Sequence, residues 1–191
     1  MDVGRTLYVK DRKQWRAWLS SHHRTSRDIW LIYYTRKSGK ARIPYNDAVE
    51  EALCYGWIDS LTKPRDQKSW VQRFTPRRKG SILSELNKAR VRKLIKSGRM
   101  RRYGLDSIRH HLVVRKKGKP NLKKFVLPKD ILESLKSDPV VWKNFVRFSE
   151  SYKQIRIGWI DGARKRPEIL SQRLRYFARM TAKNKKFGMV Q

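Results

Sequence analysis

The chain has 191 residues, with 48 lysines and arginines against 16 aspartates and glutamates, giving a formal net charge of +32 and a pI near 11. Its 39% hydrophobic content and seven tryptophans exclude a disordered basic tail, since a chain this long buries roughly 70% of its extended surface. It has no run of about 20 apolar residues for a membrane span, and its N-terminal residues lack a signal-peptide core, so we expect a folded cytoplasmic protein.

The first residues predict two strands separated by a helix. Residues 6–9 and 28–35 are rich in β-branched and aromatic side chains, which favour strands. Between them, Asp11 is a suitable N-cap for a helix that places Trp15 and Trp18 on one face. The N-terminal segment therefore predicts mixed secondary structure.

The stretch from residue 45 to residue 87 organises the rest of the chain. It predicts a helix over 47–55, with Asn46 as the N-cap and Gly56 ending the helix with a positive φ. The single cysteine, Cys54, lies on the apolar side of this helix, and we interpret it as a buried thiol.

A β-hairpin is predicted after this helix. Its strands cover residues 57–61 and 69–75, with a polar turn at 63–67. Because strand side chains alternate between two faces, about half of the aromatic residues must face the core, and we expect Trp57 and Phe74 there. A helix that leads into a hairpin needs a further layer of secondary structure to cover the apolar faces of both. This indicates a domain of mixed α and β structure.

The segment after the hairpin predicts two further helices. Ser81 is a suitable N-cap for a helix reaching about residue 97, and Gly98 ends it. Residues 99–112 predict a short helix broken near Gly104.

The last third of the chain predicts only helices. Apolar residues at helical spacing, with proline or a capping residue at each start, indicate four short helices that pack as a small bundle. The resulting fold class is α+β: an N-terminal domain of helices and a β-hairpin over 1–112, a basic linker over 113–126, and a small helical subdomain over 127–191.

The positive charge is concentrated in the centre of the chain. Residues 1–75 have a net charge of +7, residues 76–127 of +16 and residues 128–191 of +9. Half of the excess therefore lies in 52 residues, which predicts a phosphate-contacting face there. The expected contacts are Arg77, Arg78, Lys79, Arg90, Arg92, Lys93, Arg99, Arg101, Arg102, Arg115, Lys116, Lys117 and Lys119.

Motifs for catalysis, metal binding or cofactor binding are not found in the sequence. It has no H-x-x-x-H or C-x-x-C pair and no glycine-rich cofactor fingerprint. Asp59 follows two apolar residues in a predicted strand, where an acid could serve as a base. We expect it instead to pair with Arg73 or Arg77, or to cap backbone N–H groups. No catalysis, cofactor or metal is expected.

Several sequence motifs are distinctive. The most specific are AVEEALCYGWIDS at 48–60 and RFTPRR at 73–78, with helical matches in the C-terminal third that include Trp159 and Ile160. These motifs resemble the YdeI/OmpD-associated family, also called bacteriocin-protection proteins. The resemblance covers most of the chain. It implies a family fold and a cytosolic protein linked by name to envelope stress, with no established reaction.

Two segments depart from the pattern of that family. Leu83 replaces a tryptophan, and in the segment 165–170 Ile169 and Leu170 stand where the family pattern has a threonine and an arginine. The high positive charge also goes beyond an ordinary family member, and indicates a specialisation of this chain.

Charge and fold together suggest a non-catalytic nucleic-acid-binding protein. Arginines and lysines spread through folded elements favour structured RNA over DNA, and most concretely rRNA in the ribosome, beside neighbouring ribosomal proteins. No membrane partner is expected. Two alternatives stay open: a DNA-binding chromosomal protein, and an enzyme of unknown chemistry centred on Asp59, which would need a concave pocket around this residue.

Overall fold

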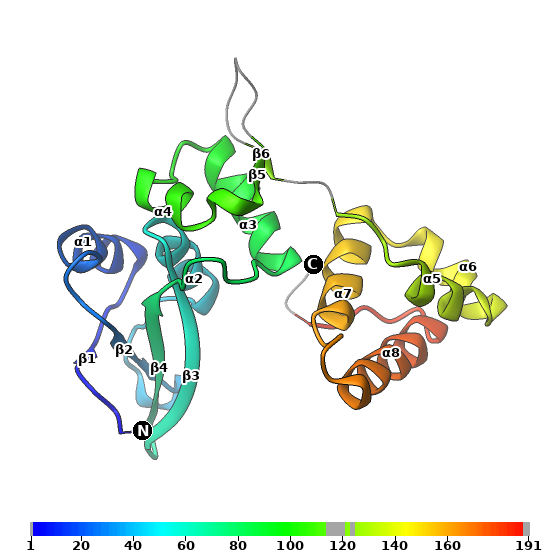
Figure 1. Cartoon of the computed structure of the whole chain (residues 1–191). Helices are drawn as coiled ribbons and strands as arrows, with labels where there is room; N and C mark the ends of the chain where they lie inside the picture. The colour runs from blue at the N-terminus through cyan, green and yellow to red at the C-terminus, as the bar shows by residue number, and fades with distance from the viewer. Residues whose placement is uncertain (1, 114–120, 123–124, 189–191) are drawn as a thin grey trace. The chain divides into compact units, whose positions relative to one another are not determined.

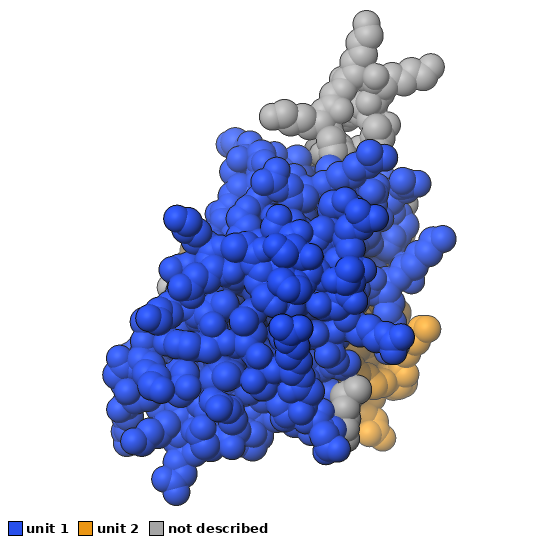
Figure 2. Space-filling view, turned by 90° about the vertical axis from the view of Figure 1, so that its left-hand side faces the viewer, with its two compact units in different colours: residues 1–81, 90–121 blue, residues 82–89, 122–191 orange. Residues whose placement is uncertain are grey.

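The computed structural model describes residues 2–113, 121–122 and 125–188 (Figure 1). The chain divides into two compact units (Figure 2): unit 1 contains residues 1–81 and 90–121, and unit 2 contains residues 82–89 and 122–191. Helices and a mixed four-stranded sheet confirm the predicted α+β class. Most of the predicted linker, 113–126, lies outside the described residues.

Unit 1 is built on a sheet of four strands in the order β1-β2-β4-β3. These are β1 (Thr6–Leu7), β2 (Ile29–Tyr34), β3 (Trp57–Asp66) and β4 (Ser69–Pro76). Strand β1 is parallel to β2, and the other pairs are antiparallel.

The polar turn of the hairpin is shorter than predicted. Residues 63–66 belong to β3, so the prediction of a turn over 63–67 is wrong. β3 is an edge strand with two register shifts, and edge strands and bulges tolerate a proline such as Pro64. The reversal is tightened by Asp66, whose carboxylate accepts hydrogen bonds from the Lys68 N–H and the Ser69 hydroxyl, both at 2.8 Å.

Helices α1 (Arg12–His22) and α2 (Tyr45–Cys54) share a core with the sheet. Trp15 on α1 donates a hydrogen bond to the Ala48 carbonyl in α2, and its ring lies 5.4 Å from that of Phe74 on β4. Trp57 and Phe74 are both buried, as expected. Asp11 caps α1, because its carboxylate accepts a hydrogen bond from the Gln14 N–H at 2.9 Å.

Two of the predicted N-caps are wrong. α2 begins at Tyr45 with Pro44 at its N-cap, and Asn46 instead accepts a hydrogen bond from the Arg90 guanidinium at 2.6 Å. α3 (Glu85–Lys96) begins four residues after Ser81. At Asn46 a tertiary contact, which the local sequence does not reveal, uses the side chain that was expected to cap the helix. At α3 the hydroxyl of Ser84, directly before the helix, accepts a hydrogen bond from the Asn87 N–H at 3.2 Å in place of Ser81.

Helix α4 (Arg102–Ser107) passes through Gly104, so the predicted break there is wrong. A Cβ at this position would lie 2.4 Å from the Cys54 carbonyl oxygen and 2.6 Å from that of Leu53. The glycine is therefore needed because the backbone of α4 packs directly on the end of α2.

Replacing Gly104 with alanine is expected to destabilise the protein by about 3 kcal/mol, at the upper end of overpacking effects, because the clashing atoms are backbone. Urea denaturation measures this change. Gly4→Ala is the matched control, since its new Cβ would meet its nearest neighbour at 3.7 Å. Equal stability of the two variants would contradict the predicted packing.

Short elements complete unit 1. They are the 3₁₀ turns η1 (Arg36–Ser38) and η2 (Arg109–His111) and the strand β5 (Leu112–Val113). β5 pairs in a separate ladder with β6 (Asn121–Leu122), whose first residue is the last of unit 1.

Unit 2 contains the four helices predicted in the last third of the chain, and it also includes residues 82–89, which were expected in the N-terminal domain. Its helices are α5 (Lys129–Lys136), α6 (Pro139–Arg147), α7 (Glu150–Asp161) and α8 (Pro167–Ala182). Asp138 and Ser149 cap α6 and α7 through side-chain oxygens. The core includes Phe145, Tyr152 and Phe177. Over the part of the chain that the structure describes, no helix combines the length and apolar character that crossing a bilayer requires.

Candidate nucleic-acid interface

The exit of the β-hairpin and helix α4 meet at the C-terminal end of α2. Gly56 follows α2 with φ +75°, and its carbonyl accepts a hydrogen bond from the Arg77 N–H at 2.9 Å. The Cys54 carbonyl accepts one from the Arg101 N–H at 3.1 Å. A Cβ at Gly56 would lie 3.0 Å from the Tyr103 carbonyl oxygen. These contacts place the segment 76–81 beside α4.

A hollow of about 600 Å³ lies between these two segments, and we call it the α4 hollow. It is lined by Arg77, Lys79, Gly80, Tyr103, Asp106, Ser107, Arg109 and His110. The Tyr103 side chain is 44% exposed, and its ring is supported by His23, with 4.4 Å between ring centroids. The hollow therefore combines cationic groups with a supported, partly exposed aromatic ring.

Asp106 is an acidic residue of this lining. Its carboxylate lies 3.3 Å from the Arg109 guanidinium and 3.9 Å from that of Arg102, whose side chain is 93% exposed. Exposed ion pairs of this kind contribute about 1 kcal/mol or less. They do not hold the two arginines in place against a stronger anionic ligand.

The structure exposes many of the predicted phosphate-contacting residues. Arg78, Lys79, Lys93, Arg101 and Arg102 are exposed, whereas Arg77 and Arg92 are half-buried. Burial lowers the pKa of Arg77, and its guanidinium donates a hydrogen bond to the Ser81 hydroxyl at 3.1 Å. We use the name α4 surface for five exposed cations that line the hollow or lie within two residues of a lining residue along the chain: Arg78, Lys79, Arg101, Arg102 and Arg109.

Two predicted residues are built into the fold of unit 1. Arg90 is 8% exposed and donates a hydrogen bond to Asn46, and burial lowers the pKa of its guanidinium. Arg99 pairs with the buried Glu51. Neither residue is placed at the α4 hollow. The predicted residues Arg115, Lys116, Lys117 and Lys119 lie outside the described residues.

Six residues that line the α4 hollow were not predicted: Gly80, Tyr103, Asp106, Ser107, Arg109 and His110. The run Arg101-Arg102-Tyr103 contains a usable signal, because an aromatic residue among cations is typical of nucleic-acid contacts. The position of Arg109 depends on how α4 packs, which the sequence pattern does not specify.

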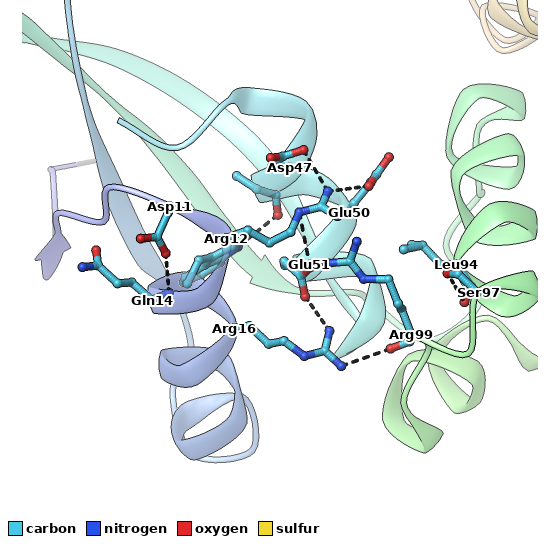
Figure 3. Close-up of polar contacts among 12 residues, drawn as sticks. Asp11, Arg12, Gln14, Arg16, Asp47, Glu50, Glu51, Leu94, Ser97 and Arg99 are labelled. Carbon is cyan, nitrogen blue, oxygen red and sulfur yellow. Dashed lines mark hydrogen bonds and ion pairs between the residues drawn. The ribbon is translucent and has the colours of Figure 1, made fainter. Parts of the chain in front are cut away.

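Glu51 is the centre of a buried ion cluster (Figure 3). Its carboxylate is fully buried, and it contacts Arg16 at 2.6 Å, Arg12 at 3.5 Å and Arg99. Arg12 also pairs with Asp47 at 2.8 Å and with Glu50 at 2.5 Å. Arginines of α1 and of the segment before α4 thus converge on one carboxylate of α2.

This cluster fixes the segment that leads into α4. The Arg99 carbonyl accepts a hydrogen bond from Arg16 at 3.3 Å, in addition to the ion pair made by its side chain. The cluster therefore holds α1, α2 and the start of the α4 surface together, and its arginines serve the fold.

The two candidate reactive groups, the Asp59 carboxylate and the Cys54 thiol, both have structural roles in the fold. Asp59 accepts a hydrogen bond from the Tyr45 hydroxyl at 2.6 Å, whereas Arg73, its expected partner, pairs with Asp28 at 2.5 Å. Cys54 is buried, and burial raises the pKa of its thiol to about 11. Within the described ranges, no group of three or more histidine, cysteine or acidic side chains is placed to hold a metal ion.

Comparisons with known proteins find two family models, which match different parts of the chain. Residues 7–107 match a domain of unknown function, DUF8412, and residues 124–184 match the family described as bacteriocin-protection, YdeI or OmpD-associated. The second match confirms the resemblance to that family and lies in the C-terminal helices. The motif at 48–60, which the sequence analysis gave as the most specific for that family, lies in the first match. No curated protein and no solved structure matches the chain.

Proposed function

Because the chain belongs to the DUF8412 family, whose description names no activity, we propose its function from the geometry of unit 1: the protein binds structured RNA without catalysis. The observation that carries this proposal is the α4 surface, where five exposed cations are at or next to a hollow of about 600 Å³. Exposed cations at this density attract a polyanion and release its counterions when they bind it.

The contrast between arginines that are paired inside the fold and arginines that are exposed to solvent supports the proposal. Arg12, Arg16 and Arg99 neutralise a buried carboxylate, so the fold uses their charge. Arg101 and Arg102 follow directly along the chain, yet both are exposed. A net charge of +32 opposes compaction unless a polyanion compensates it, which favours a phosphate-rich partner for the exposed cations.

RNA suits the α4 hollow better than a regular DNA duplex does. Tyr103 is partly exposed on the lining, and it offers a ring on which an unpaired base can stack. RNA presents unpaired bases in loops and bulges beside a phosphate backbone. Arginine supplies 25 of the 48 basic residues, and its planar guanidinium both pairs with phosphate and stacks on bases. We therefore favour rRNA as the partner.

Sedimentation of a cell lysate through a sucrose gradient tests the proposal. The protein is expected to migrate with a ribosomal subunit and to leave it at high salt. A fourfold variant, Arg78→Gln, Lys79→Gln, Arg101→Gln and Arg102→Gln, is expected to stay near the top of the gradient, because it loses most of the α4 surface.

The control for this experiment removes the same charge elsewhere in unit 1. It carries Arg5→Gln, Lys13→Gln, Arg36→Gln and Lys37→Gln, all at exposed positions outside the α4 surface. It is expected to co-migrate with the subunit as the wild type does. Equal behaviour of the two fourfold variants would contradict the proposed site, and association that DNase abolishes would show chromosomal DNA to be the partner.

A further inference from the structure

Unit 2 contains a second hollow, of about 780 Å³, on one side of helix α8, and we call it the α8 hollow. Its lining includes two aromatic residues, Trp159 of α7 and Tyr176 of α8, and three arginines, Arg173, Arg175 and Arg179. None of the phosphate contacts predicted from the sequence lies in this part of the chain. Among the described residues that line the hollow, none is acidic.

The lining residues of α8 form a stripe along the helix. Ile169, Gln172, Arg173, Tyr176 and Arg179 are spaced by three or four residues, which places them on neighbouring turns of one face. The stripe is therefore produced by the helix itself and extends over about three turns.

Both aromatic rings are held in place from behind. The Phe187 ring packs edge-on against Tyr176, with 4.8 Å between centroids, and against Trp159 at 5.8 Å. The Arg173 guanidinium lies 4.7 Å from the Trp159 ring centre and donates a hydrogen bond to the Trp159 carbonyl at 2.5 Å. Ordering these groups in advance lowers the entropic cost of binding a ligand.

Tyr176 is 37% exposed, and the Arg179 guanidinium lies 5.4 Å from the centre of its ring. Arg175 and Arg179 are both exposed on the same helix. An aromatic face beside arginines that can reach a phosphodiester backbone is the chemistry that recognises unpaired nucleotides.

We propose that the α8 hollow is a second RNA subsite, which accepts an unpaired base on Tyr176 while Arg175 and Arg179 contact the flanking phosphates. This inference rests on the proposed RNA-binding function and adds a requirement of its own. RNA with an unpaired segment uses this subsite, whereas a regular duplex, whose bases are stacked, does not.

The test compares a short unstructured RNA with the blunt duplex of the same sequence, by fluorescence anisotropy on the full-length protein. Tyr176→Leu removes the aromatic face, and it is expected to weaken single-strand binding about 5- to 100-fold. Duplex binding is expected to change less than about twofold, since the subsite does not contribute to it. Tyr176→Phe keeps the ring and is expected to bind as the wild type does.

Two further measurements keep the test decisive if Tyr176→Leu perturbs the packing on Phe187. Arg179→Gln is expected to weaken single-strand binding, and Arg147→Gln, an exposed charge of unit 2 outside the hollow, is the matched control. Photocrosslinking with a thiouridine-containing single strand, followed by digestion at lysines, is expected to label the peptide 166–183 or 154–165.

The outcomes separate this inference from the proposed function. If the wild type binds both RNAs but Tyr176→Leu binds the single strand unchanged, or no crosslink falls in those two peptides, the α8 subsite is wrong and the proposed function stands. If the wild type binds neither RNA, both are wrong. Loss of single-strand binding in Tyr176→Leu, with recovery in Tyr176→Phe, supports the subsite.

Discussion

Glu51→Gln is expected to lower the free energy of unfolding by about 3–5 kcal/mol, the usual cost of removing one partner of a buried ion pair. The Glu51 carboxylate is fully buried and faces the guanidinium groups of Arg12, Arg16 and Arg99. A neutral amide would leave these cations close together without their shared counter-charge, and the side-chain shape would hardly change. The midpoint and slope of urea denaturation measure the effect.

Asp47→Asn is the matched control for this variant. Asp47 also pairs with Arg12, but its side chain is 38% exposed, so its loss is expected to cost about 1 kcal/mol or less. A Glu51→Gln protein as stable as Asp47→Asn would show that burial does not strengthen the cluster. If the prediction holds, the loss of Glu51 should also loosen the segment around Arg99 that precedes the α4 surface.

RNA affinity is expected to fall by about three to five decades between about 50 and 200 mM salt, if about 6–10 phosphates are contacted. The physical cause is the entropy of the counterions that binding releases, which shrinks as the bulk salt concentration rises. A titration of Kd against salt, plotted on logarithmic axes, gives the number of contacts from its slope.

The fourfold variant of the α4 surface makes this measurement specific. Each phosphate contact that is lost should reduce the slope by about one, so the slope of the fourfold variant is expected to be smaller than that of the wild type by about four. The control at Arg5, Lys13, Arg36 and Lys37 is expected to keep the wild-type slope. A flat titration with both RNA and DNA would rule out nucleic-acid binding altogether.

The elements of the fold could be predicted wherever the signal is local. The periodicity around Trp15 and Trp18, the capping side chain of Asp11 and the helix end at Gly56 all act through a few neighbouring residues. The same is true of Asp138 and Ser149 in unit 2, whose side chains cap the helices that follow them.

Elsewhere, contacts distant in sequence overrode the local signals. Asn46 is a good capping residue in isolation, but Arg90 uses its side chain. Glycine disfavours the interior of a helix, but Gly104 lies inside α4 because it lets this helix approach the carbonyls of α2. Glu51 fits a helix start in the sequence, and nothing nearby reveals that three arginines from other segments converge on it.

The candidate site could be predicted only in part for the same reason. Charge density along the chain identified the region that contains Arg78, Lys79, Arg101 and Arg102, because that quantity is additive in sequence. It could not separate these exposed residues from the buried Arg90 and the paired Arg99. That separation requires knowledge of which side chains the fold uses.

Helix α3 has a consequence for how this protein could be divided or recombined. Residues 82–89 belong to unit 2, where Glu85 packs against Gly158 of α7, whereas the chain from Arg90 onward belongs to unit 1. The two units are therefore interleaved along the sequence, and no single cut separates them. A chimaera that exchanges the C-terminal helices would also have to carry the first turn of α3, because Glu85 packs against α7.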